Sequence, residues 1–405
     1  MTHSSPSSAR RHRPHVCMVV HSHYPVREPR AEREALAAVA AGYAVDVICL
    51  RFPGERAKEV VDDIAITRLP VRHVRGASAA RAVTEYVGFA LRAAITVLKI
   101  HRESQIDIVY IHAPPDFLVA AALIPRLLGS KVVLDIHDLS PHMFDARFGH
   151  RPGAQVVQRA LRQVERIACS LAHRVVTVHD PYRAELIAHG VPATKISVVM
   201  NAPSPDVLAA ARAAVGNGKV TKDFIVAYHG TVTRWYGVDL LVDAIALLED
   251  RLPRLRGLIL GEGDALSSAE ALAYRRGVAR QVDFSGSFVS HVEALSRVAG
   301  ASCGVIPNRP SRLNRFALSS KLLEYVSLEI PAVVARLETL EAHFSADEVT
   351  FFEPGSAESL AAAIAWVAEH PGEAREKARR AKARAEAYSW SVNRVRLLNA
   401  LSPSS

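Results

Sequence analysis

The sequence is poor in cysteine, with four among 405 residues. These are Cys17, Cys49, Cys169 and Cys303. None is in C-x-x-C spacing and three lie in or beside apolar runs, which argues against a disulfide framework and favours a reducing cytosol. The 18 histidines form no H-E-x-x-H or similar spacing. The sequence therefore predicts no metal site.

Long apolar runs are also missing. No stretch reaches the roughly 18 apolar residues that cross a bilayer, and the nearest, 83–100, contains three charged residues. The first 14 residues are polar and basic, and the apolar run after them, Val16–Val20, is too short for a signal peptide. We therefore expect a disordered tail over 1–14 and a cytoplasmic protein.

Composition and charge further restrict the class of protein and its partners. With 49% hydrophobic and 22% charged residues, the chain resembles an ordinary soluble protein, and its length predicts two domains of about 150 to 200 residues each. The net charge of +9 suits nucleic acid, an anionic membrane or a phosphorylated substrate. The basic residues are spread out and show no aromatic interleaving, so we expect no nucleic-acid partner.

Short β-branched runs alternate with helical patterns along the whole chain, which predicts parallel sheets buried on both faces. The predicted strands are 16–21, 44–50, 64–69, 107–112, 131–136, 174–178, 196–200, 224–229, 257–260, 282–285, 303–306, 332–335 and 349–352. A loop-like stretch over 201–222, with two prolines and two glycines, interrupts the alternation. The fold class predicted is α/β, with two Rossmann-like doubly wound domains facing across a cleft.

Five segments follow from this pattern. They are the tail 1–14, an N-terminal domain 15–205, a linker 206–222, a C-terminal domain 223–388, and a helix 389–405. In doubly wound sheets, ligands bind outside the carboxyl ends of the strands. We therefore expect the functional site in the cleft between the two domains.

The segment 305–335, VIPNRPSRLNRFALSSKLLEYVSLEIPAVVA, is the most informative. A strand leads to an arginine-rich loop, and a helix opens at Ser319 and Ser320, where hydroxyls and backbone N–H groups suit a phosphate. Lys321 adds a cation at the same helix end. Glu324, about one turn further on, is placed to accept hydrogen bonds from a ribose diol.

The SKLLEY and PAVV motifs of this segment resemble the donor-binding block of the retaining glycosyltransferase family four. Further blocks follow in the family's order, and two in the N-terminal half resemble bacterial members that build surface polysaccharides. These blocks are YHGTVTRWYGVDLLVDAIALL (228–248), GEGD (261–264), VDFSGSF (282–288), HSHYPVREPRAEREALAAVAAGYAVDVICL (21–50) and KVVLDIHDLSPHMF (131–144). The resemblance implies a GT-B-type architecture and transfer of a sugar, with retention, from a nucleotide diphosphate sugar to a glycan or lipid-linked saccharide. It also implies an acceptor-binding N-terminal domain 15–205, a nucleotide-sugar-binding C-terminal domain 223–388, and a helix 389–405 that returns to the N-terminal domain. That donor is a co-substrate, and no cofactor is implied.

The resemblance also implies roles for individual residues. His137 follows a strand at the position where the family's histidine approaches the donor sugar, and Asp138 is beside it. Arg234 and Lys321 are expected to converge on the donor diphosphate and to stabilise it, without metal, as it leaves. These four residues are the predicted catalytic set. The predicted donor-binding residues are Gly230, Thr231, Gly261, Glu262, Gly263, Ser319, Ser320 and Glu324.

The sequence departs from the family pattern in three features. Phe316 stands eight residues before Glu324, where the family has the first of two glutamates. Thr231 and Tyr236 stand at the places of the usual arginine and lysine, and residues 24–27 replace a glycine pair. Two other hypotheses therefore stay open: a nucleotide-sugar epimerase of the same fold, and a non-catalytic nucleotide-sugar-binding partner subunit.

A long amphipathic helix is predicted over 80–102. Its apolar residues include Val83, Val87, Leu91 and Ile95. The ordinary interpretation is that these side chains face the core and the basic ones face solvent. The alternative is a peripheral contact with an anionic membrane at its inner face, which the basic residues would favour.

Overall fold

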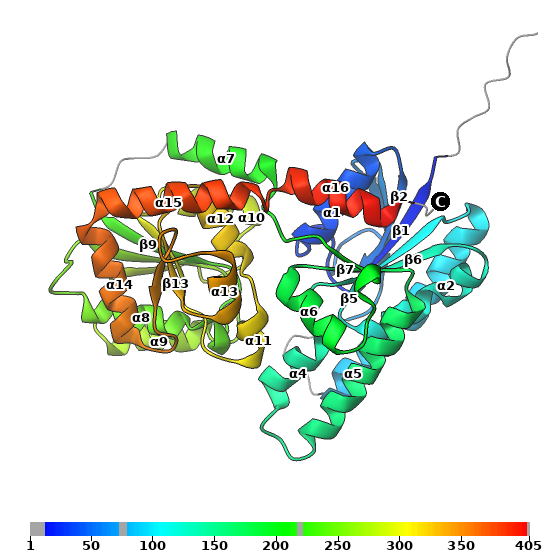
Figure 1. Ribbon diagram of the computed structural model, residues 1–405, viewed down its shortest axis with the longest axis horizontal. Coiled ribbons are helices and arrows are strands. Elements are labelled where there is room, and N and C mark those ends of the chain that lie inside the picture. The colour runs from blue at the N-terminus through cyan, green and yellow to red at the C-terminus, as the bar shows by residue number, and fades with distance from the viewer. Residues whose placement is uncertain (1–12, 73–78, 217–221, 403–405) are drawn as a thin grey trace, which may run out of the picture.

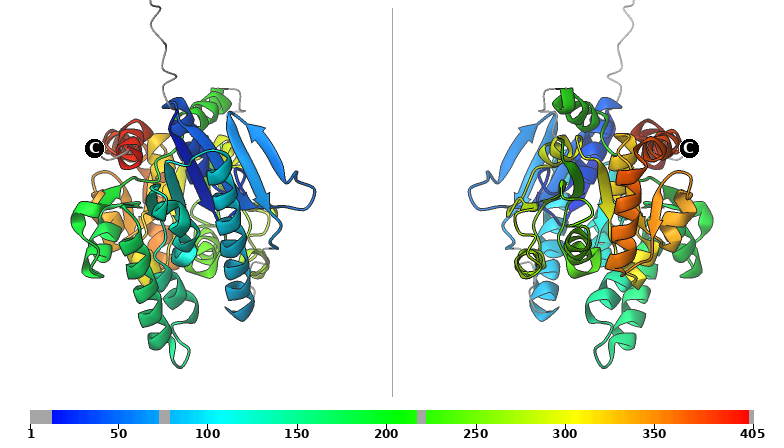
Figure 2. Two further views of the ribbon diagram at one scale, coloured as in Figure 1. Left: turned by 90° about the vertical axis from the view of Figure 1, so that its right-hand side faces the viewer. Right: turned by 90° about the vertical axis from the view of Figure 1, so that its left-hand side faces the viewer.

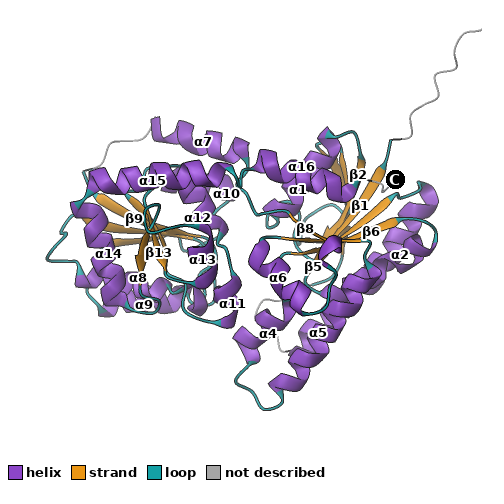
Figure 3. Ribbon diagram, in the orientation of Figure 1, coloured by secondary structure: helices purple, strands orange, loops and turns teal. Residues whose placement is uncertain are grey.

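The computed structural model describes residues 13–72, 79–216 and 222–402. The predicted disordered tail lies almost entirely outside these residues. Two α/β halves lie side by side (Figure 1), and each has its sheet in the middle with helices packed around it (Figure 3). Over the described residues, no helix combines the length and the apolar character needed to span a bilayer.

The first half contains an eight-stranded sheet in the order β3-β4-β2-β1-β5-β6-β7-β8. Its strands are β1 (His15–Val20), β2 (Ala44–Leu50), β3 (Lys58–Val61), β4 (Ile64–Leu69), β5 (Ile108–Ala113), β6 (Lys131–Ile136), β7 (Arg174–Thr177) and β8 (Ile196–Val198). All neighbouring pairs are parallel except β3 with β4. The order reverses between β1 and β5, so a crevice is expected at their carboxyl ends.

The second half contains a six-stranded parallel sheet in the order β11-β10-β9-β12-β13-β14. Its strands are β9 (Phe224–His229), β10 (Leu255–Leu260), β11 (Val282–Phe284), β12 (Cys303–Ile306), β13 (Ala332–Ala335) and β14 (Thr350–Phe352). The order reverses between β9 and β12. The two predicted Rossmann-like sheets are therefore present, and each predicted strand range matches an observed strand to within two residues at either end. The edge strand β3 was not predicted.

Helices cover the sheets of both halves. In the first half they are α1 (Pro29–Ala40), α2 (Ala79–Glu103), η1 (Asp116–Ala122), α3 (Leu123–Leu127), α4 (Ser140–Phe148), α5 (Ala154–Leu171), α6 (Asp180–Ala188) and η2 (Ala193–Lys195). In the rest of the chain they are α7 (Pro205–Gly216), η3 (Arg234–Tyr236), α8 (Val238–Leu247), α9 (Leu266–Arg275), α10 (His291–Val298), α11 (Arg312–Phe316), α12 (Ser320–Ser327), α13 (Glu338–His343), α14 (Ala357–Glu369), α15 (Pro371–Glu386) and α16 (Trp390–Leu401). The views turned by 90° show α4 and α5, in green, projecting from the body of the molecule (Figure 2).

Two predictions about helices are corrected by the structure. The predicted loop-like linker contains the helix α7, because Pro205 suits the first helical turn and the alanine-rich run after it has high helix propensity. The helix predicted over 80–102 is present as α2, but the row Val83, Val87, Leu91 and Ile95 is 44% to 69% exposed. The core is contacted instead by Phe89, Ala93 and Val97.

The last helix connects the two halves. Helix α15 runs along the second half, and α16, in red, lies over the first half beside α1 (Figure 1). Leu397 and Leu401 pack into the core of the first half, and the Asn393 side-chain oxygen accepts a hydrogen bond of 2.8 Å from the Met200 N–H. The end of the chain therefore spans both halves.

Candidate active site

The carboxyl ends of the two sheets share a cavity of about 950 Å³. Residues 21–23 after β1, Phe52 after β2 and Asp138 after β6 line one side of it. Thr231 after β9 and Glu262 after β10 line the other. A second hollow of about 440 Å³ lies beside the amino ends of β10 and β11, at the edge where ligands do not usually bind. The larger cavity is therefore the candidate site, and it is large enough for a substrate.

Three glycines allow two turns of the second half to pack closely against each other. Gly230 and Gly261 have positive φ values of 104° and 140°, and a Cβ at Gly261 would lie 1.9 Å from the Gly230 carbonyl oxygen. A Cβ at Gly263 would lie 1.9 Å from the Val232 carbonyl oxygen. Because only glycine fits this packing, the two turns hold Thr231 and Glu262 at the cavity wall.

Lys321 lies directly behind the Gly230 turn. A Cβ at Gly230 would be 2.5 Å from the Lys321 Cε, and the Lys321 ammonium lies 4.8 Å from the ring centroid of Tyr236. Burial lowers the pKa of Lys321, and the negative charge of Glu324 opposes this shift. Tyr236 lines the cavity whereas Lys321 does not, so the tyrosine ring lies beside both the ammonium and the cavity.

Glu324 is bound by two histidines that the sequence had not indicated. His229 Nε2 lies 2.6 Å from Oε2, and His291 Nε2 lies 2.9 Å from Oε1. Burial raises the pKa of Glu324, but the hydrogen bonds from both histidines outweigh this and hold the pKa well below its usual range. Each carboxylate oxygen keeps a further lone pair, but Glu324 is buried, at 5% exposed, and is not among the residues that line the cavity. The sequence feature that could have pointed to this contact is the position of His229, at the end of a strand and before a glycine turn.

The structure does not bring Arg234 to the cavity. Arg234 is exposed, while Trp235 and Tyr236 of the same short turn line the cavity. Ser319 takes the N-cap position of α12 without a side-chain capping hydrogen bond, and the side chains of Ser319 and Ser320 are half-buried. Of the two predicted cations, only Lys321 therefore lies against the glycine turns.

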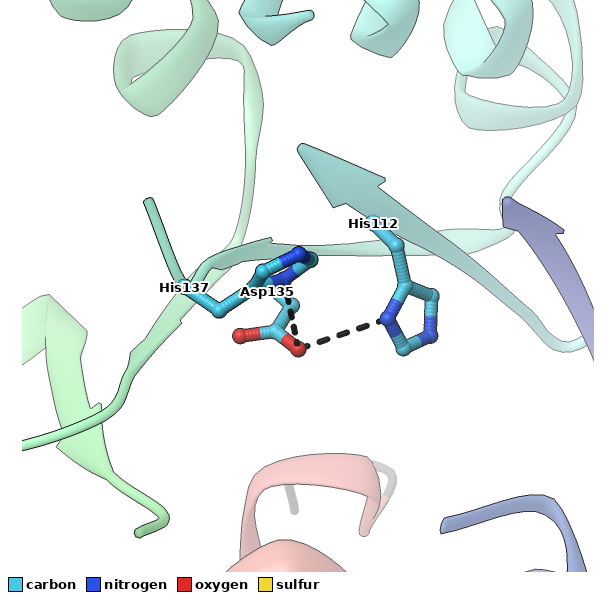
Figure 4. A group of neighbouring side chains, drawn as sticks. All are labelled: His112, Asp135 and His137. Carbon is cyan, nitrogen blue, oxygen red and sulfur yellow. Dashed lines mark ion pairs between the residues drawn. The ribbon is translucent and has the colours of Figure 1, made fainter. Parts of the chain in front are cut away.

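His137 and Asp138 follow β6 at the cavity edge. Asp138 lines the cavity, and burial raises its pKa. His137 lies outside the lining, with Nδ1 3.7 Å from Asp135 Oδ2 (Figure 4). Burial lowers the pKa of His137, but the nearby Asp135 carboxylate opposes this and raises the pKa to about 9.

Among the described residues, His112, Asp135 and His137 form one group whose potential ligand atoms lie within 4.8 Å of one another. The sequence gave no signal of it because the residues come from two strands. Arg30 already binds both oxygens of Asp135, with Nε 2.7 Å from Oδ2 and Nη2 3.0 Å from Oδ1. A divalent ion would face this guanidinium at the same carboxylate, so the group fits a buried ion network better than a metal site.

Two further residues at the site were missed from the sequence. Phe316, which stands in place of the family's first glutamate, packs 5.1 Å from the His142 ring of the opposite half. Arg27, in the segment that replaces the glycine pair, reaches across the cavity to Glu262. Both positions departed from the family pattern, and both now make contacts between the two halves.

Comparison with known families agrees with this architecture. Residues 28–202 match the model of the glycosyl transferase 4-like domain, and residues 210–387 match that of glycosyl transferases group 1. A sequence search of the curated proteins gives no match.

Several solved structures share the fold. Sucrose-phosphate synthase from Thermosynechococcus elongatus has a TM-score of 0.76 at 17% identity, with 96% of this chain and 100% of that chain covered. HepE from Anabaena, in complex with UDP-glucose, has a TM-score of 0.69 at 15% identity, with 96% and 99% covered. WaaG, a glycosyltransferase involved in lipopolysaccharide biosynthesis, has a TM-score of 0.69 at 16% identity, with 95% and 98% covered. The chain is therefore a glycosyltransferase of the two-domain GT-B type, built from a glycosyl transferase 4-like domain and a group 1 domain.

Proposed function

We propose that this enzyme takes a sugar from a nucleotide diphosphate donor, held mainly by the second half, and transfers it with retention to a glycan or lipid-linked saccharide held by the first half. The observation that carries the proposal is the cavity at the carboxyl ends of both sheets, with the Gly230 and Gly261 turns on one wall. Support also comes from HepE, which shares the fold and is solved with UDP-glucose.

Residues in and behind the cavity wall suit this chemistry. The bond between the sugar C1 and the β-phosphate oxygen breaks, and both electrons stay on the leaving diphosphate. A hydroxyl oxygen of the acceptor bonds to C1, and its proton passes to that phosphate. The departing group gains negative charge, which a preorganised cation such as Lys321 stabilises more than it stabilises the bound donor. In this proposal His137 and Asp138 position the sugar, and Glu324 binds the ribose.

A thermal-shift panel of nucleotide sugars tests the first step. A donor at about 100 times its dissociation constant stabilises the protein by roughly 2.7 kcal/mol. The active donor is then incubated with glycan and lipid-linked acceptors, and the anomeric configuration of the product is determined. Release of an altered nucleotide sugar without acceptor would favour the epimerase, and donor binding without any product would favour the partner subunit that Phe316 keeps open.

The proposal includes independence from metal ions and organic cofactors. Lys321 offers a cation behind the Gly230 turn, which in this proposal stabilises the leaving diphosphate without a bridging ion. Turnover should persist after exhaustive treatment with EDTA. A loss of turnover that magnesium or manganese restores would overturn this part of the proposal.

We also propose that the enzyme works at the inner face of a membrane, where a lipid-linked acceptor would be presented. Besides the exposed apolar row on α2, the neighbouring α3 and its C-cap residue expose Ile124, Leu127 and Leu128. The basic residues of these helices are Arg81, Arg92, Lys99, Arg102 and Arg126. This combination suits anionic lipid. Flotation should show binding to anionic vesicles and not to phosphatidylcholine, and Leu91→Asp with Ile95→Asp should abolish it; equal behaviour on both vesicles would count against the idea.

A further inference from the structure

The cavity has an unusual charge distribution for a site that takes a diphosphate. Of the described residues that line it, four are carboxylic acids, and Arg27 is the single lysine or arginine. The acids are Glu85, Asp138, Glu262 and Asp264. A diphosphate that entered this cavity would meet carboxylates of its own sign on both walls. Apart from the titratable His21 and His23, Arg27 is therefore the position among these lining residues whose permanent positive charge can compensate it.

Arg27 extends from the first half to the second. It follows β1 and precedes α1, and its Nη1 lies 2.6 Å from Glu262 Oε1, in the turn between Gly261 and Gly263. The centre of its guanidinium lies 4.8 Å from the Phe288 ring centroid and 5.6 Å from that of Phe52. Aromatic rings from both halves thus hold the guanidinium at the cavity wall.

We infer that Arg27 is a further donor-binding residue, which exchanges Glu262 for the diphosphate of the nucleotide sugar when the donor enters. This inference rests on the proposed function. It gives Glu262 the role of holding Arg27 before the donor binds, in place of the donor-binding role predicted from the sequence. It also gives the diphosphate a cation from the half opposite to Lys321.

The exchange is favoured by charge and by geometry. A diphosphate carries more negative charge than the single carboxylate of Glu262, and a guanidinium presents a planar fork of five N–H donors that matches phosphate oxygens. The ion pair between Arg27 and Glu262 involves Nη1 of the guanidinium. The Arg27 side chain is 23% exposed and the Glu262 side chain is 32% exposed. Partly exposed ion pairs are weak, so little free energy opposes the exchange.

The experiment measures binding of nucleoside diphosphates and of the matching nucleosides by titration calorimetry. Arg27→Ala should raise the Kd of the bound diphosphate about 10- to 100-fold, the scale of a hydrogen bond to a charged group, and Arg27→Lys should recover part of the loss. The Kd of the nucleoside, which has no phosphate, should not change. Arg276→Ala removes a surface ion pair of 2.7 Å with Asp243 and should leave both Kd values as they are.

The Glu262→Gln variant separates exchange from a merely structural bridge. If Glu262 competes with the donor, Glu262→Gln lowers the Kd of the diphosphate a few-fold and has no effect in an Arg27→Ala background. If Arg27→Ala binds the diphosphate normally, or if Glu262→Gln weakens binding as much as Arg27→Ala does, the inference is overturned while the proposed function stands. If the wild type binds no nucleoside diphosphate of the panel, both fall together.

Discussion

Replacing Glu324 by glutamine gives the sharpest test of the donor site. The substitution keeps the volume of the side chain and removes its charge. His229 Nε2 and His291 Nε2 now donate to separate oxygens at 2.6 Å and 2.9 Å. A glutamine offers one oxygen and one NH₂ group, so at most one of these hydrogen bonds survives unchanged. The ribose would also lose its charged acceptor.

The expected loss follows from these contacts. A hydrogen bond to a charged group contributes about 1.5 to 3 kcal/mol, so the Kd of the donor should rise about 10- to 150-fold. Titration calorimetry with the donor found in the thermal-shift panel measures it. Glu329→Gln is the matched control, because Glu329 lies just beyond the end of the same helix and pairs with Lys382 away from the cavity. Donor affinity that is unchanged in Glu324→Gln would remove this residue from the site and refute the reasoning.

Three further results are expected. Lys321→Met should lower kcat about 10²- to 10³-fold with a smaller change in donor KM, because the ammonium acts on the charge of the leaving diphosphate; near-normal kcat would contradict this. Gly263→Ala should lower the free energy of unfolding in urea by about 2 to 4 kcal/mol, since its Cβ would lie 1.9 Å from a carbonyl oxygen, whereas Gly372→Ala, with open space around it, should not. The lowered pKa of Glu324 means that its contribution to stability is present above the ordinary glutamate pKa of about 4.3 and is lost as the pH falls below it. The difference in unfolding free energy between wild type and Glu324→Gln should therefore shrink from pH 5 towards pH 3, and a constant difference would contradict the assignment.

The proposed exchange at Arg27 and the proposed role of Lys321 predict different effects of substitution at these two residues. Arg27 is in the first half and Lys321 is in the second, and the cavity lies between the halves. A diphosphate that contacts both would hold the halves together. Variants at Arg27 should therefore act mainly on donor binding, whereas Lys321 variants should act mainly on the rate.

The sequence by itself determined the two sheets. Parallel strands covered on both faces must be continuously apolar, so ranges such as Phe224–His229 and Cys303–Ile306 could be read directly from local composition. The exposed strand β3 has no such run and was missed. The glycine turns at 230 and 261 were also predictable, because a conformation with positive φ restricts the residue type at that position alone.

Only the tertiary structure decided which side chains meet. Arg27 and Glu262 are 235 residues apart in the chain, and His229 and His291 reach Glu324 from different elements, so no local pattern relates them. The direction of Arg234 depended on how its short turn packs, and the outward row of α2 depended on which of two apolar faces the sheet buried. Periodicity reports whether a side chain can be buried, whereas pairing between distant charges depends on the distance and orientation that the packed fold imposes.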